Sequence, residues 1–110
     1  MELRQHRRFR AQFRSYFSGN CSGLPGEGVV YDLSVGGCRI MSLDTINVND
    51  DLELYIFPDD SHAELFIQKA RICWRMGREF GVAFIVLQPD VSKRLVQVLA
   101  ALGVEEPPRF

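Results

Sequence analysis

The sequence predicts a small, mainly β protein, an antiparallel barrel or sandwich of six strands that ends in one α-helix. Six short segments are predicted to be strands, two of them with alternating residues (9–17 and 52–57), and turn-forming residues separate the six at roughly 8 to 12 residue spacing. Near the C-terminus, apolar residues recur at helical intervals instead. A length of 110 residues with 46% hydrophobic residues fits one soluble domain, without the ~20 consecutive apolar residues of a membrane span.

The first predicted strand, residues 9–17, has one apolar face and one charged face. Its apolar positions alternate with arginine, glutamine and tyrosine, which is the period of two of a half-buried strand. The residues expected to face inward are Phe9, Ala11, Phe13, Ser15 and Phe17. The stretch at 18–28 is rich in glycine and serine, so we expect it to form a loop between two strands.

The later elements follow from the same patterns. Short β-type runs bounded by turn residues predict strands at residues 29–33, 38–41, 52–57, 65–75 and 80–87. A helix is expected from Asp90, with Pro89 ahead of it and Gly103 as its stop. We therefore expect residues 1–110 to form a single domain, with an arm at 1–8, a barrel at 9–88 and a helix at 90–103.

Charge is distributed unevenly, although the formal net charge is only −1. Residues 1–14 carry five arginines and one acid, whereas residues 44–64 carry seven acids and no lysine or arginine. Of the thirteen basic residues, eleven are arginine, whose forked guanidinium suits contacts to phosphate or stacking on a planar ring. The arm should therefore attract a small anion, while the acidic middle of the chain should repel a long polyanion.

Two arginines of the arm, Arg4 and Arg8, lie four residues apart directly before the first strand. This spacing puts both guanidiniums on one side of the chain, whether the segment is extended or helical. Such a pair can hold a dianion through charge-assisted hydrogen bonds or lie flat on a purine. The alternative is a solvated, frayed basic terminus.

A second candidate group, Asp32-Leu33-Ser34-Val35-Gly36-Gly37, lies between two predicted strands. Asp32 and Ser34 are two residues apart, so their side chains are expected on the face opposite Leu33. A carboxylate there can accept the N–H donors of a guanine edge, and a hydroxyl can bridge to a base or a phosphate. Glycine is expected to allow positive φ at this bend and to leave space for a flat ligand. The alternative is that Asp32 and Ser34 only cap a tight turn.

Together the two groups resemble the paired signature of PilZ domains, RxxxR followed by D/NxSxxG. The matching residues are Arg4, Arg8, Asp32, Ser34 and Gly37. The resemblance covers nearly the whole chain, because three later parts of the family pattern follow in the same order. These are the tryptophan strand Ile72-Cys73-Trp74-Arg75, the Gly-x-x-Phe strand Gly81-Val82-Ala83-Phe84, and the C-terminal helix.

The resemblance implies a six-stranded antiparallel β-barrel that binds the bacterial second messenger cyclic di-GMP. Arg4 and Arg8 would clamp its phosphates and contact its guanines. Asp32 and Ser34 would read a guanine, and Gly37 would give clearance. Because ordering an arm costs about 1–2 kcal/mol per residue in backbone entropy, the arm is expected to fold onto the barrel only when the ligand binds.

Further ligand-binding candidates are Arg7, Gly36 and Trp74. Trp74 can offer a ring face to the ligand, although a lone tryptophan on a strand is more often part of the core. The resemblance allows one cyclic di-GMP or an intercalated pair. Leucine at position 3, where a further guanidinium could hold the second copy, favours one ligand per chain, and the alternative is that Arg7 or Arg10 supplies that guanidinium.

Three other functions are compatible with parts of the sequence. A protein-interaction module can keep the fold without using the ligand, although both motifs are intact here. A nucleic-acid-binding barrel would use the arginines and aromatic residues of the first strand, which the acidic stretch at 44–64 opposes. A hydrolase can be imagined on Asp32, Ser34 and His6, but no nucleotide-triphosphate motif is present and the two histidines lack metal spacing.

We therefore expect a binding protein rather than an enzyme, without a cofactor or a metal. Its expected partners are cyclic di-GMP and a protein effector in trans, in a pathway such as motility, biofilm formation or exopolysaccharide synthesis, and not nucleic acid or a membrane. A cytoplasmic location is expected, since the N-terminus is charged rather than signal-like. The expected oligomeric state is a monomer or a weak homodimer. Cys21, Cys38 and Cys73 lack CxxC spacing and are expected as small core or edge residues.

Overall fold

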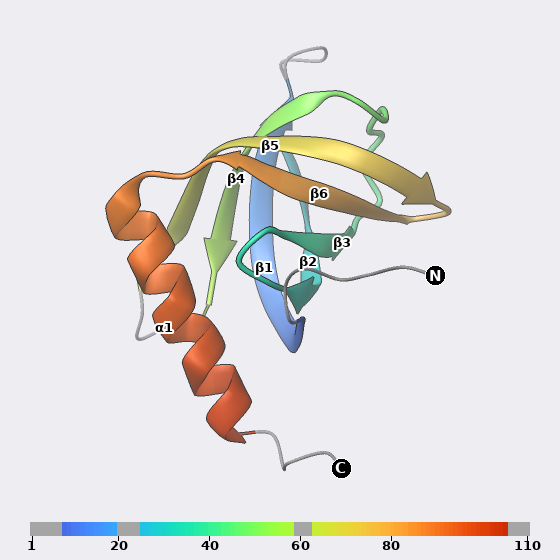
Figure 1. Ribbon diagram of the computed structural model, residues 1–110. Coiled ribbons are helices and arrows are strands. Elements are labelled where there is room, and N and C mark those ends of the chain that lie inside the picture. The colour runs from blue at the N-terminus through green and yellow to red at the C-terminus, as the bar shows by residue number, and fades with distance from the viewer. Residues whose placement is uncertain (1–7, 20–24, 59–62, 106–110) are drawn as a thin grey trace, which may run out of the picture.

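The computed structural model describes residues 8–19, 25–58 and 63–105. Within them, six strands form a closed antiparallel barrel, and a C-terminal helix follows (Figure 1). The elements are β1 (Phe9–Gly19), β2 (Pro25–Leu33), β3 (Gly37–Met41), β4 (Asp51–Phe57), β5 (Leu65–Met76), β6 (Glu79–Val86) and α1 (Pro89–Glu105). The order around the barrel is β1-β2-β3-β6-β5-β4, and β4 pairs with β1 to close it. This confirms the predicted fold class in its barrel form.

The barrel interior is filled by the inward-facing residues of the alternating strands. Phe17, Leu54 and Ile56 are buried, as the alternation predicts, and the rings of Phe17 and Phe80 meet edge to face with 5.5 Å between centroids. Each fully buried aliphatic or aromatic side chain of this kind contributes about 1.5–3 kcal/mol to folding. Ser15 is also buried, and its hydroxyl donates a hydrogen bond of 2.9 Å to the Gly28 carbonyl.

The loop predicted at 18–28 is wrong in its limits, because β1 continues to Gly19 and β2 begins at Pro25. Ser18 is opposite Pro25, and Phe17 is opposite Gly26. A Cβ atom on Gly26 would lie 2.4 Å from a ring carbon of Phe17, so this glycine makes room for a core ring. Strand pairing thus uses residues whose composition indicates a loop.

Helix α1 lies beside the end of the barrel where β1 begins (Figure 1). Its apolar face is buried at Val91, Leu95 and Leu99, as the helical spacing predicts. The expected stop at Gly103 is wrong, because the helix continues to Glu105. A Cβ atom on Gly103 would lie 3.0 Å from a ring carbon of Phe9, so this glycine allows a close contact between helix and barrel. None of the described helical residues forms a segment long and apolar enough to cross a membrane.

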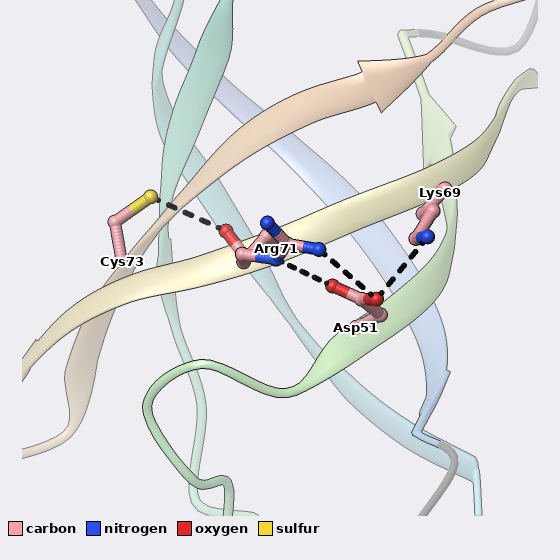
Figure 2. A network of polar contacts seen from close by, with 4 residues as sticks. All are labelled: Asp51, Lys69, Arg71 and Cys73. Atoms are coloured by element: carbon pink, nitrogen blue, oxygen red, sulfur yellow. Dashed lines mark hydrogen bonds and ion pairs between the residues drawn. The ribbon is translucent and has the colours of Figure 1, made fainter.

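The two cysteines that the structure describes have different surroundings. Cys38 is buried, and this burial raises the pKa of its thiol far above the ordinary value. Cys73 is exposed on β5, where its thiol lies 3.5 Å from the Arg71 carbonyl oxygen (Figure 2). Cys38 is therefore a core residue and Cys73 a surface strand residue, while Cys21 lies outside the described residues.

An ion-pair network joins β4 to β5 on the outside of the barrel (Figure 2). Arg71 Nε donates a hydrogen bond of 2.9 Å to Asp51 Oδ1, and Lys69 Nζ lies 3.5 Å from Asp51 Oδ2. The hydrogen bond from Arg71, followed by the positive charges of Arg71 and Lys69, lowers the pKa of the Asp51 carboxyl. Asp51 therefore carries its charge in the folded protein at neutral pH.

We predict that Asp51→Asn lowers the stability of the protein slightly at neutral pH and makes no difference in acid. The contribution of Asp51 is present above the carboxyl pKa of the unfolded chain, and it disappears as the pH falls through the lowered folded-state pKa. Unfolding midpoints of wild type and variant, compared at pH 7 and below about pH 3, test this. Glu53→Gln, on the same strand, is the control; an Asp51→Asn deficit of equal size at both pH values would contradict the prediction.

Candidate ligand-binding site

Five residues form a row across the outer surface of β1, β2, β3, β6 and β5, which we call the outer row. It consists of Arg10, Asp32, Arg39, Gly81 and Trp74. Asp32 is opposite Arg10 on one side and opposite Arg39 on the other. Gly81 is opposite both Arg39 and Trp74. Because directly opposed residues in a sheet lie about 5 Å apart, the row gathers a carboxylate, two guanidiniums and an indole on one surface.

Two β-bulges bring Asp32 and Trp74 to the outside. The register shifts between Val30 and Asp32 in β2, and again between Ile72 and Trp74 in β5. Val30 and Ile72 are fully buried, and strict alternation would turn Asp32 and Trp74 inward as well. The extra residue in each bulge changes the side on which the next side chain lies, so both project from the outer surface.

The Trp74 indole packs against the backbone of Gly81. A Cβ atom on Gly81 would be only 2.1 Å from the indole Nε1, so the ring occupies the space that a side chain would take. Trp74 is still 38% exposed. The expectation that a lone strand tryptophan belongs to the core is therefore wrong here, and the ring is available at the surface.

Arg39 is a further candidate for the site, which the sequence alone does not indicate. Its Nε lies 3.2 Å from Asp32 Oδ2, and its Nη1 lies 3.3 Å from Glu79 Oε1. The guanidinium also lies over the ring of Tyr31, 5.9 Å from the centroid. Alternation after Cys38 predicts that Arg39 faces outward, but its two acidic partners follow only from the register of β2, β3 and β6.

Ser34 and the two glycines after it form a tight turn at the end of the outer row. The Ser34 hydroxyl donates to the Gly37 carbonyl and accepts from the N–H groups of Gly36 and Gly37, each at 3.2 Å. Ser34 is only 7% exposed, so it does not share the solvent-facing position of Asp32. The Ser34 hydroxyl therefore caps the turn, and the expected common face with Asp32 is wrong because the strand ends at Leu33.

The two glycines of this turn, Gly36 and Gly37, do not adopt the positive φ that the sequence predicts. Among the described residues only Asn49 and Gly77 have positive φ, so the expectation of positive φ at Gly36 or Gly37 is wrong. A Cβ atom on Gly37 would lie 2.2 Å from the Val82 carbonyl oxygen, so Gly37 lets β3 approach β6. The Gly36 carbonyl accepts a hydrogen bond of 2.9 Å from the N–H of Phe84, which ties the turn to β6.

We predict that Ser34→Ala destabilises the protein by about 1–3 kcal/mol, because it leaves the N–H groups of the turn without their acceptor. Chemical denaturation of wild type and variant measures this loss. Ser18→Ala is a suitable control, since the Ser18 hydroxyl makes only a long, exposed contact of 3.4 Å with Glu53. Equal stability of the Ser34→Ala variant and wild type would contradict a capping role.

Of the remaining predicted site residues, the structure describes Arg8. Arg8 is exposed and directly precedes β1, whose first residue, Phe9, is opposite Leu33. The chain therefore enters the barrel next to Asp32 and the turn that follows it. Arg4 and Arg7 lie outside the described residues. In the part of the chain that the structure describes, no three His, Cys, Asp or Glu side chains gather as metal ligands would.

The sequence matches the PilZ domain family over residues 2–101. No curated protein sequence matches the chain. Among solved structures, the PilZ domain with c-di-GMP of YcgR from Escherichia coli is 13% identical, with a TM-score of 0.80 and 94% of each chain covered. At this level of identity, the likeness concerns the fold.

Two longer proteins contain the same fold. The Bacillus subtilis inhibitor of motility MotI/DgrA is 15% identical with a TM-score of 0.79, and the match covers 97% of this chain and 55% of that one. The MrkH–c-di-GMP complex of K. pneumonia is 17% identical with a TM-score of 0.78, and the match covers 96% of this chain and 54% of that one. The chain spans about half the length of these two neighbours, and its match to the family covers all six strands and most of the helix. It belongs to the PilZ domain family.

Proposed function

We propose that this protein is a receptor for cyclic di-GMP, which binds over the outer row and the turn at Ser34. The observation that carries the proposal is the outward-facing Asp32 carboxylate, flanked in register by Arg10 and Arg39, beside the point where Arg8 enters the barrel. Cyclic di-GMP carries two phosphates, which cations can pair with, and guanine edges, which a carboxylate can accept hydrogen bonds from. PilZ structures of the same fold, from YcgR and MrkH, contain this nucleotide.

Each group has a distinct chemical task in this proposal. The Arg8 guanidinium, with Arg4 and Arg7 of the arm, pairs with the phosphates through charge-assisted hydrogen bonds. The Asp32 carboxylate accepts the ring N–H and the amino group of one guanine. Trp74 offers its exposed ring to a base, an interaction worth about 1–3 kcal/mol. Ser34, Gly36 and Gly37 act indirectly, by fixing the turn that follows Asp32.

The proposed output is a change of surface rather than a reaction. Ligand contacts offset the entropy of ordering the arm, and the ordered arm, the nucleotide and the barrel form a combined surface. We infer that a protein effector recognises this surface in trans. The Ser34 hydroxyl, the candidate nucleophile of the hydrolase alternative, bonds to the backbone of the turn and, among the described residues, not to a base. Cyclic di-GMP recovered intact after incubation with the protein is the expected result, and hydrolysis would contradict this part of the proposal.

Two signals of the same titration test the binding mode. Trp74 is the only tryptophan in the sequence, so a change in its fluorescence on addition of cyclic di-GMP reports directly on the outer row. Amide hydrogen exchange should show new protection at residues 3–9 in the bound protein. A Trp74→Phe variant, which removes the fluorescence signal but not the proposed phosphate contacts, serves as the control. Binding without either signal would contradict the site, and equal protection of the arm in both states would contradict the switch.

A further inference from the structure

Arg39 is shared between two carboxylates on opposite sides. Nε faces Asp32 at 3.2 Å, and Nη1 faces Glu79 at 3.3 Å. Glu79 is on β6 and is opposite Met41, one outward position along from the Arg39–Gly81 pair. The Arg39 guanidinium is therefore held diagonally across β3 and β6, rather than only against Asp32.

The contact between Arg39 and Asp32 is close but incomplete. The Arg39 Nε is buried and has no hydrogen-bond partner of good geometry, although Asp32 Oδ2 is 3.2 Å away. An unopposed arginine beside a carboxylate tends to form a two-bond fork that uses both carboxylate oxygens. The contact with Glu79 on one side and the Tyr31 ring below hold the guanidinium out of that arrangement. The Asp32 oxygens therefore keep acceptor capacity for another donor.

We propose that Glu79 is a positioning residue for the guanine-reading carboxylate, and that it sets the preference of the site for guanine over adenine. This inference rests on the proposed function. By holding Arg39, Glu79 keeps Asp32 in one orientation with its oxygens accessible. Glu79 itself acts through Arg39 and makes no contact with the base.

The base preference follows from donor and acceptor patterns. The guanine edge presents a ring N–H next to an amino group, and a fixed carboxylate accepts from both. The corresponding edge of adenine presents an amino group next to a ring nitrogen with a lone pair, which faces a carboxylate oxygen unfavourably. If Glu79 loses its charge, Arg39 is free to take both oxygens of Asp32. Guanine then competes with Arg39 for the Asp32 oxygens, while adenine, which gains little from Asp32, is affected much less.

The test is a double-mutant cycle read out by affinity for cyclic di-GMP and for cyclic di-AMP. Calorimetry is carried out on wild type, Glu79→Gln, Arg39→Gln and the double variant. Glu79→Gln should weaken cyclic di-GMP binding roughly tenfold and leave cyclic di-AMP binding unchanged, so that the selectivity ratio falls. In the Arg39→Gln background, the change at Glu79 should have no further effect. Glu53→Gln, an exposed acid on β4 away from the outer row, should leave both affinities unchanged.

The outcomes separate this inference from the proposed function. Wild type that does not bind cyclic di-GMP at all would contradict the proposed function. Wild type that binds, with a Glu79→Gln variant that has the wild-type selectivity ratio, would overturn the positioning role alone. Additive effects of the two substitutions would also overturn it, because they would mean that Glu79 acts independently of Arg39.

Discussion

Replacing Arg8 with alanine is expected to weaken cyclic di-GMP binding by about 2–5 kcal/mol, a factor of roughly 30 to 5,000 in the dissociation constant. The loss is large because one phosphate charge remains in the complex without its partner. Arg8 is exposed and precedes the first strand, so its removal should leave the barrel intact. Isothermal calorimetry measures the affinity, and the thermal unfolding midpoint reports on the fold.

Arg94→Ala is the matched control for this prediction. Arg94 lies on α1, where its guanidinium donates a hydrogen bond of 3.0 Å to the Glu64 carbonyl, away from the outer row. The Arg94→Ala substitution removes the same positive charge as Arg8→Ala, so it shows how much the affinity for a dianionic ligand changes through net charge alone. An Arg8→Ala variant that binds as tightly as Arg94→Ala would show that Arg8 is not a phosphate ligand.

A second large effect is expected at Gly37, this time on stability. In Gly37→Ala, the new Cβ would lie 2.2 Å from the Val82 carbonyl oxygen and 3.3 Å from the Ala83 Cα. Both are backbone atoms of the paired strand, so β3 and β6 must separate to admit the methyl group. We expect a loss of about 3 kcal/mol, which corresponds to a fall of roughly 10–20 °C in the unfolding midpoint.

Gly19→Ala provides the comparison, because its nearest neighbour is the Leu52 Cδ2 at 3.4 Å, an ordinary contact. Its effect on the unfolding midpoint should be small. If Gly37→Ala were as stable as Gly19→Ala, then the close approach of β3 to β6 would not be the reason for glycine at position 37. A role in giving the ligand clearance would then be the better explanation, and only the affinity would change.

The fold could be predicted from the sequence to the extent that it depends on which side chains face inward. Strict alternation places Phe17, Leu54 and Ile56 in the core, and helical spacing gives the buried face of α1. Where glycine serves a contact between distant parts of the chain, the prediction failed. Gly26 makes room for Phe17, and Gly103 for Phe9, although locally each indicates a loop or a helix end.

The candidate site was less accessible to sequence reasoning, because its geometry depends on bulges and on strand pairing. Alternation from Ile72 turns Trp74 inward, and the bulge between them reverses this. The spacing of Asp32 and Ser34 suggests a shared face, but the end of β2 lies between them. Glu79 lies 47 positions after Asp32, and only the neighbouring positions of β2, β3 and β6 bring both acids to Arg39.

The central claim is that a cationic arm and the outer row together hold one cyclic di-GMP. Calorimetric titration of the wild-type protein with cyclic di-GMP at micromolar concentration tests it most directly. We predict saturable heat that fits one ligand per chain, with much weaker binding of cyclic di-AMP. A folded sample that gives no heat with cyclic di-GMP, or that binds single-stranded oligonucleotides instead, would contradict it.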